Sequence, residues 1–201
     1  MKTIGITGGV GSGKSEVLRF LEETYGAVVC EADKMAHRLQ SRGTYCYEKI
    51  VEYFGEEILD PEKKIDRKKL GAVVFSDPEK LQFLNNLIHP EVKKCFLKQM
   101  EEESESGTPL LVIEAALLLE EHYEEICDEL WYIYAEKDVR VRRLKAARGY
   151  TEERCREIMQ NQNPDEIFRK KCDRVINNSG SFADTKKQIE EILKKMEIQS
   201  R

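Results

Sequence analysis

Five short stretches of the chain are rich in apolar, β-branched or aromatic residues, which is typical of buried strands. They are Lys2–Thr7, Ala27–Cys30, Leu110–Ile113, Leu130–Ala135 and Asp173–Asn178. The interiors of the first, third and fourth lack charged residues, as expected for strands of a parallel sheet that is covered on both faces. Segments between and after them carry apolar residues at helical spacing. The pattern predicts an α/β fold with a five-stranded parallel sheet and helices on both faces.

One connection between the predicted strands is unusually long. From about Gly43 to Gly107 the apolar spacing is mostly helical, with breaks at Gly55 and Asp60-Pro61. Roughly sixty residues therefore separate two strands, which is far more than a simple crossover needs. This length predicts an inserted helical subdomain.

A glycine-rich motif follows the first predicted strand. Residues 8–15 read G-G-V-G-S-G-K-S, which fits the phosphate-binding pattern G-x-x-x-x-G-K-[ST]. A strand before it and a helical pattern after it supply the context that this motif requires. A chance match in an ordinary glycine-rich turn is the alternative.

The physical basis of the motif is a concave run of backbone N–H groups, which glycine conformations allow. The positive end of the following helix adds to the attraction for phosphate. Lys14 is expected to reach the β- and γ-phosphates, and Ser15 to hold Mg²⁺. The predicted nucleotide-binding residues of this loop are Gly9, Val10, Gly11, Ser12, Gly13, Lys14, Ser15 and Glu16.

Charge and cysteine content narrow the class of protein. Lysine and arginine number 33 against 38 acidic residues, a net charge of −5, so non-specific nucleic-acid binding is not indicated. The six cysteines are widely spaced, without a zinc-type cluster, and we expect them to be reduced thiols. No apolar run approaches the length of a membrane span. We therefore expect a cytoplasmic protein that associates with neither membranes nor nucleic acid.

A negatively charged protein must meet an anionic substrate with local basic clusters. The helical segment 137–149 is such a cluster, with four arginines: Arg140, Arg142, Arg143 and Arg148. It is either a solvated helix face or a source of guanidinium groups for a transferring phosphoryl group.

Asp33 follows the second predicted strand. It stands where a helix would begin, so it is either the N-cap or a functional carboxylate at the carboxyl edge of the sheet, where open α/β folds bind ligands. Position alone leaves both interpretations open.

Further motifs, in order along nearly the whole chain, resemble the dephospho-CoA kinase family. Glu31-Ala32-Asp33 with His37 is similar to the D-A-D segment of that family. Later matches are Phe54-Gly55, Ile65-Asp66-Arg67 with Leu70, His89-Pro90, Leu117-Leu118-Leu119-Glu120, Arg143-Leu144 with Arg148, Gln162-Asn163-Pro164, and Val175-Ile176-Asn177-Asn178-Ser179-Gly180. Each motif alone is weak, but their shared order is strong.

The chain departs from the family pattern at a few positions. Glu31 replaces the first Asp of D-A-D, Ala116 a proline, and Glu114 the usual Asp. One extra residue separates Arg143 from Arg148, which leaves the choice of lid arginine open.

The resemblance implies a P-loop NTPase fold in three parts: a nucleotide core (about 1–42, 108–136 and 171–201), a helical CoA-binding insertion (about 43–107) and a lid (about 137–170). It implies transfer of phosphate from ATP, with Mg²⁺, to the ribose 3′-hydroxyl of dephospho-CoA, the last step of coenzyme A synthesis. Monomers or weak homo-oligomers are expected. The alternatives are a nucleoside or nucleotide kinase on the same scaffold, and a nucleotide-dependent switch without turnover.

The resemblance also implies roles for single residues. Asp33 would orient and deprotonate the 3′-hydroxyl, and Lys14 and lid arginines would offset phosphoryl charge. Asn177 and Gly180 would border the adenine of ATP. The implied catalytic residues are Asp33, Lys14, Arg143 and Arg148, and the implied substrate-binding residues are Asp33, His37, Arg67, His89 and Leu118.

Overall fold

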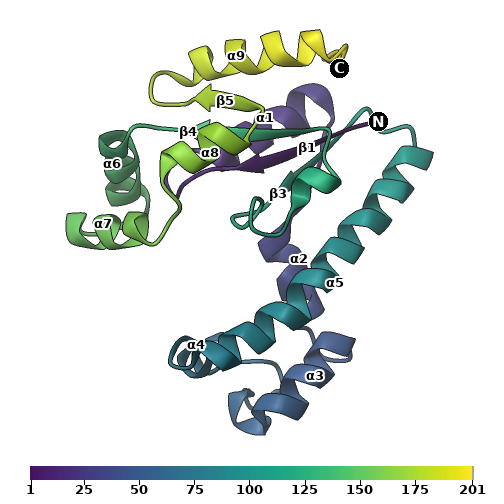
Figure 1. Cartoon of the computed structure of the whole chain (residues 1–201), viewed down its shortest axis with the longest axis vertical. Helices are drawn as coiled ribbons and strands as arrows, with labels where there is room; N and C mark the ends of the chain where they lie inside the picture. Colours follow the sequence, from purple (N-terminus) through teal and green to yellow (C-terminus); the bar gives the residue numbers. More distant parts are fainter. Residues whose placement is uncertain (201) are drawn as a thin grey trace. The chain divides into compact units, whose positions relative to one another are not determined.

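The computed structural model describes residues 1–200, which divide into two compact units (Figure 1). The first unit comprises Met1–Cys30 and the described residues from Glu101 onward. The second unit is Glu31–Met100. The first unit contains the sheet and the glycine-rich loop, and the second is mostly helical.

The sheet has five parallel strands in the order β2-β3-β1-β4-β5. They are β1 (Lys2–Thr7), β2 (Val28–Glu31), β3 (Leu110–Glu114), β4 (Glu129–Tyr134) and β5 (Arg174–Asn177). The central strand β1 pairs with β3 on one side and β4 on the other. Because the strands are parallel, their carboxyl ends meet at one edge, where α/β folds place their ligands.

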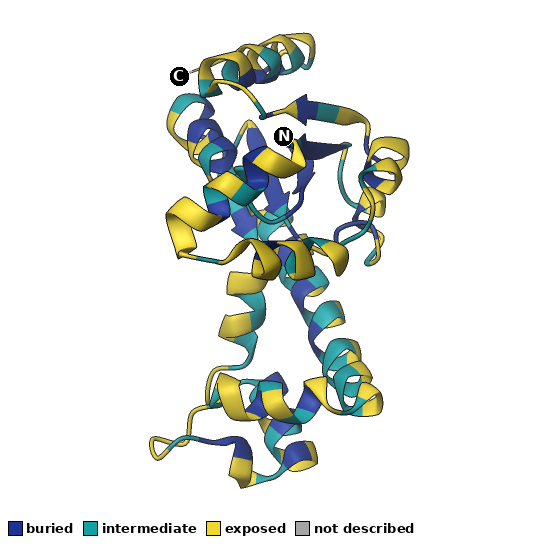
Figure 2. Cartoon of the chain, turned by 90° about the vertical axis from the view of Figure 1, so that its left-hand side faces the viewer, coloured by how far each residue is buried: buried dark blue, intermediate teal, exposed yellow. Residues whose placement is uncertain are grey.

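One face of the sheet is covered by α1 (Lys14–Tyr25) and α9 (Phe182–Lys195). Alternate residues of a strand point to the same face, and this face carries Ile4, Ile6, Leu110, Val112, Trp131, Ile133 and Ile176. They pack with Val17 and Leu21 of α1 and with Ile189 and Leu193 of α9. The three central strands β1, β3 and β4 are accordingly mostly dark blue, the colour of buried residues, in Figure 2.

The opposite face is covered by the segment after β3 and by α8 (Asp165–Lys171). Phe168 of α8 stacks on Tyr132 of β4, with ring centroids 4.8 Å apart and planes 13° apart. Gly5 leaves room for Leu118, whose Cδ1 atom would lie 2.9 Å from a Cβ added at that glycine. The prediction of a five-stranded parallel sheet with helices on both faces is confirmed. The sequence pattern does not predict helix α8.

The second unit contains α2 (Ala32–Leu39), α3 (Tyr45–Phe54), α4 (Arg67–Phe75) and most of α5 (Pro78–Glu105). Tyr53 of α3 stacks on Phe83 of α5 with ring centroids 3.7 Å apart. Helix α5 continues through Pro90, although proline cannot donate the helical hydrogen bond to the carbonyl four residues earlier. The described structure contains no helix that is long and apolar enough to cross a membrane.

The remaining helices, α6 (Lys137–Arg148) and α7 (Glu152–Gln160), lie side by side in the first unit. Thr151 caps α7, since its side-chain oxygen accepts a hydrogen bond from the N–H of Arg154. The sequence predicted both helices. The interpretation of Asp33 as an N-cap is wrong, because Glu31 is the N-cap residue of α2 and Asp33 lies within the first helical turn.

All six cysteines are free thiols. Burial is the main cause that raises the pKa of the Cys127 thiol to about 12, and the nearby carboxylates of Asp128 and Glu124 raise it further. Burial, assisted by Asp173, raises the pKa of Cys172 to about 12 as well. Both thiols are therefore almost wholly protonated at neutral pH.

We predict that these two thiols resist alkylation in the folded protein. Because the thiolate is the reactive species, iodoacetamide at about pH 8 should modify Cys127 and Cys172 about 10²-fold more slowly than in the urea-unfolded chain. Peptide mass spectrometry over a time course measures both rates. Equal rates in the folded and unfolded chains would contradict the assigned burial.

Candidate active site

The glycine-rich loop joins the carboxyl end of β1 to the amino end of α1, as predicted. Gly13 is the N-cap residue of α1 and adopts the left-handed conformation, with φ 92° and ψ 22°. A Cβ at this position would lie 2.2 Å from Nδ2 of Asn178. Glycine is therefore required by both backbone conformation and close packing. No side chain caps this helix end, so its first N–H groups remain available for an anion.

Lys14 is held close to the loop by two contacts. Its ammonium donates a hydrogen bond of 2.8 Å to the carbonyl of Gly8 and lies 3.5 Å from Oε1 of Glu114. The two side chains are only 17% and 15% exposed, so the pair is poorly screened by solvent. Glu114 ends β3, directly beside Ile6 of β1. The site thus places one cation and one carboxylate at the same edge of the sheet.

Arg140 of α6 is the arginine that is most deeply embedded in the site. Arg140 is buried, with only 8% of its surface exposed. Its Nε donates to the carbonyl of Val10 over 2.9 Å, and its terminal nitrogen donates to Oε1 of Gln162 over 2.5 Å. The same oxygen accepts the N–H of Val10 over 3.2 Å. Arg140 and Gln162 therefore fasten one side of the glycine-rich loop.

The two lid arginines singled out from the sequence lie in different surroundings. Arg143 is half-buried, and it donates a hydrogen bond of 3.2 Å to the carbonyl of Ser12. Arg148 is the exposed last residue of α6, and its guanidinium lies 5.9 Å from the ring centre of Tyr150. The structure thus brings Arg143, but not Arg148, to the loop.

The loop after β5 also meets the glycine-rich loop. Asn177 and Gly180, predicted to border adenine, are exposed. Between them, Asn178 is fully buried and donates from Nδ2 to the carbonyl of Ser12 over 2.8 Å. The predicted metal ligand Ser15 is exposed in the first turn of α1, and Glu16 is half-buried in the same turn.

Most of the predicted acceptor residues belong to the second unit. Asp33 and His37 are exposed on α2, Arg67 is exposed at the start of α4, and His89 is half-buried within α5. Asp33 makes no hydrogen bond or ion pair within residues 1–200, whereas Glu31 pairs with Lys34 over 2.5 Å.

The remaining predicted acceptor residue, Leu118, lies in the first unit and is fully buried. Its neighbour Leu117 is 43% exposed. Leu117 is therefore the leucine of this pair that has surface available for a ligand.

Three residues of the site were not assigned a role from the sequence: Arg140, Glu114 and Asn178. Arg140 was one of several arginines in a basic helix, with nothing in its spacing to distinguish it. Glu114 had one usable signal, an acidic residue at the carboxyl end of an apolar strand. Asn178 contacts a carbonyl 166 residues away in sequence, so local pattern could not reveal its partner.

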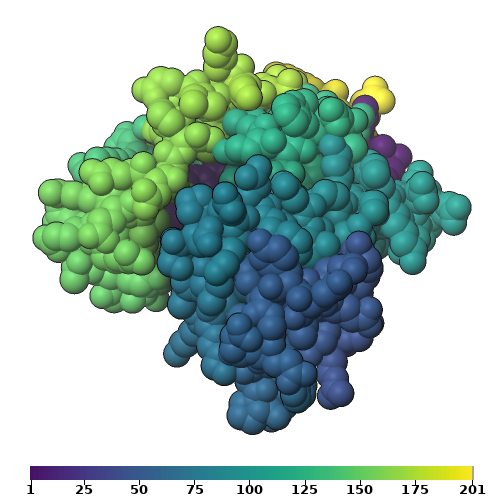
Figure 3. All heavy atoms as spheres, turned by 60° about the horizontal axis from the view of Figure 1, so that its bottom comes forward, coloured from purple at the N-terminus to yellow at the C-terminus, as the bar shows by residue number. Residues whose placement is uncertain are grey.

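Two hollows adjoin α6. One, of about 300 Å³, is lined by residues of the site that include Gly9, Tyr132, Arg140 and Gln162. Figure 3 shows the surface of this region, with dark purple N-terminal residues visible beside the green segment that contains α6 and α7.

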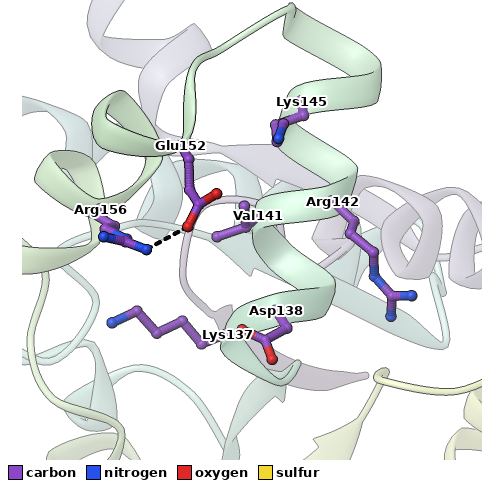
Figure 4. Close-up of a pocket in the computed structure, with 7 residues that line it drawn as sticks. All are labelled: Lys137, Asp138, Val141, Arg142, Lys145, Glu152 and Arg156. Atoms are coloured by element: carbon purple, nitrogen blue, oxygen red, sulfur yellow. Dashed lines mark hydrogen bonds and ion pairs between the residues drawn. The ribbon is translucent and has the colours of Figure 1, made fainter.

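The other hollow, of about 530 Å³, lies between α6 and α7 (Figure 4). Its charged side chains are Lys137, Asp138, Arg142, Lys145, Glu152 and Arg156. Glu152 and Arg156 form an ion pair there, and Arg142 extends away from them in the view of Figure 4. The carboxylates of Asp138 and Glu152 lie among the basic side chains of this hollow. This side of α6 is therefore a solvated face of mixed charge. The opposite side, with Arg140 and Arg143, contacts the loop.

Comparison with known proteins places this architecture in a family. A family model described as dephospho-CoA kinase matches residues 2–184. A dephospho-CoA kinase of Carboxydothermus hydrogenoformans is 39% identical over 192 residues, which cover 96% of this chain and 93% of the relative.

Solved structures also match this chain over nearly its whole length. A Thermus thermophilus protein matches with a TM-score of 0.80 and 33% identity, over 96% of this chain and 97% of its own. A dephospho-CoA kinase of Campylobacter jejuni matches with a TM-score of 0.72 and 28% identity, over 98% of both chains. These matches favour the main interpretation over a nucleoside or nucleotide kinase. The chain belongs to the dephospho-CoA kinase family.

Proposed function

We propose that the protein transfers the γ-phosphoryl group of ATP to the ribose 3′-hydroxyl of dephospho-CoA, giving coenzyme A and ADP in the cytoplasm. The observation that carries the proposal is the Lys14 ammonium, which contacts the carbonyl of Gly8 and the carboxylate of Glu114 at the glycine-rich loop. The chain also matches a dephospho-CoA kinase over 96% of its length. Phosphoryl transfer requires little covalent chemistry from the protein, so positioning and charge stabilisation supply most of the catalysis.

The loop and Lys14 would bind the triphosphate. Backbone N–H groups at the start of α1 face an anion with the positive end of the helix dipole behind them. Lys14 would exchange its contacts with Gly8 and Glu114 for phosphate oxygens. As a compact point charge it offsets negative charge on the transferring group.

The residues present fit a magnesium ion. Ser15 offers a hydroxyl and Glu114 a carboxylate, both oxygen donors. No cluster of three or more His, Cys, Asp or Glu residues suited to a metal exists within residues 1–200. Mg²⁺ needs few protein ligands, because it keeps several waters and binds substrate phosphates. When bound, the ion would neutralise charge on the phosphates.

Asp33 is the proposed general base for the 3′-hydroxyl. A carboxylate that receives a proton must not already be engaged by a cation, and Glu31 is paired with Lys34 whereas Asp33 is not. This difference supports Asp33 over Glu31. His37, Arg67 and His89 are proposed to bind the acceptor, together with the exposed Leu117 in place of the buried Leu118. Asn177 and Gly180 are proposed to border adenine.

The segment 137–170 is proposed to act as a lid that closes over the nucleotide, since closure excludes water and completes the site. The contact of Arg143 with Ser12 supports Arg143 as the lid arginine next to the phosphates. Arg148 would reach them only after movement of α6.

Acceptor choice tests the proposed function directly. We predict that ADP release depends on dephospho-CoA and is at least about tenfold slower with AMP, CMP or adenosine, because remote binding energy is used to position the reacting hydroxyl. A coupled ADP assay with equal acceptor concentrations measures the rates. Equal or faster turnover of AMP would establish a nucleotide kinase instead, and ATP binding without turnover on any acceptor would favour a switch.

Lys14→Ala should lower turnover by about 10²-fold or more, since it removes a charge that acts on the transferring phosphoryl group. Lys195→Ala, in the last turn of α9, removes a lysine remote from the loop and serves as the matched control. Wild-type turnover of Lys14→Ala would mean that this loop does not catalyse the reaction.

Asp33→Asn should fold, bind ATP normally and lose about 10²-fold or more in turnover, because a positioned general base contributes about 10²- to 10⁴-fold. Glu31→Gln should lose less. Nucleotide titration and steady-state rates separate binding from turnover. If Asp33→Asn is active and Glu31→Gln inactive, the base is Glu31.

A further inference from the structure

The carbonyl of Ser12 accepts hydrogen bonds from two side chains that come from distant parts of the chain. Asn178 donates from Nδ2 over 2.8 Å, and Arg143 donates from a guanidinium nitrogen over 3.2 Å. Ser12 is only 1% exposed and Asn178 is fully buried. Water therefore has little access to this carbonyl, and the Asn178 amide is its shorter contact.

The direction of this carbonyl determines the direction of the next N–H. In a planar trans peptide the C=O and N–H bonds point in opposite directions. Holding the Ser12 oxygen against Asn178 therefore turns the Gly13 N–H to the other side of the loop. That N–H donates no hydrogen bond within residues 1–200. It sits at the start of α1, where an anion is favoured.

Asn178 is itself oriented by Thr185 of α9. Thr185 is fully buried, and its hydroxyl lies 2.8 Å from Oδ1 of Asn178. The Ser12 carbonyl can only accept, so it must face the amide NH₂ group. Oδ1 then faces Thr185, whose hydroxyl must donate to it. The backbone N–H of Asn178 is also held, by the carbonyl of Tyr134 over 2.7 Å.

We propose that Asn178, oriented by Thr185, is a positioning residue that fixes the Ser12–Gly13 peptide and so presents the Gly13 N–H to a phosphate oxygen of the nucleotide. The pair acts through the backbone and does not touch the ligand. It links the end of the sheet to the glycine-rich loop. The proposal rests on the proposed function only in taking ATP as the nucleotide.

The test is calorimetric titration of Mg²⁺–ATP into the full chain without acceptor. Asn178→Ala, which leaves the Ser12 carbonyl with Arg143 alone, should weaken ATP binding about tenfold, and Asn178→Asp at least as much, since an unpaired or repelled buried group is costly. Thr185→Val keeps the shape but removes the hydroxyl, and it should weaken binding about threefold or more. Thr185→Ser keeps the hydroxyl and should stay within about twofold of wild type.

Asp173→Asn is the control for a general loss of stability. Asp173 accepts the N–H of Leu130 over 2.7 Å at the amino end of β5, the sheet edge away from the loop. The substitution Asp173→Asn should lower the melting temperature without weakening ATP binding. Nuclear magnetic resonance adds a specific readout, because the Gly13 amide signal should shift on ATP addition in wild type and shift less in Asn178→Ala.

ATP binding within about twofold of wild type for Asn178→Ala would overturn the proposal, since a buried hydrogen bond is worth more than that. The proposal would also be overturned if the loss of ATP affinity followed the decrease in melting temperature across all variants, Asp173→Asn included. Because no acceptor is present, these results are independent of whether dephospho-CoA proves to be the substrate.

Discussion

A phosphate-binding loop must turn its N–H groups inward, and this constraint requires that its carbonyl groups point outward and find donors elsewhere. Here the donors come from distant segments. Arg140 holds the carbonyl of Val10, and Arg143 and Asn178 hold that of Ser12. The loop is consequently shaped before a nucleotide arrives. Preorganised donors avoid the cost of reorganisation during binding and reaction.

The same constraint gives α6 two different faces. The arginines on one side contact the loop, whereas Arg142 and Lys145 on the other side belong to a solvated face with interspersed carboxylates. One side of the basic helix is therefore a solvated face, and a role of the arginines on the other side toward a phosphoryl group stays a prediction. We expect a protein of net charge −5 to bind anionic substrates through such local placement of charge, because its overall field repels them.

Local chemistry explains what could be predicted from the sequence. The apolar runs identified the strands, and the glycine motif identified the loop, because strand burial and left-handed glycine are local requirements. Arg140 and Asn178 could not be identified in this way. Their loop contacts span 130 and 166 residues, so they depend on how strands and helices come together. Asp33 lies within the first turn of α2 and does not cap it, because Glu31, the last residue of β2, is itself the N-cap residue.

The central claim is that the protein phosphorylates the ribose 3′-hydroxyl of dephospho-CoA. Locating the new phosphate in the product by phosphorus–proton correlation spectroscopy tests it most directly. We predict a phosphorus signal that is coupled to the ribose H3′ proton, formed in equal amount to ADP. A phosphate coupled to H2′, or ADP formed without a phosphorylated product, would contradict the account.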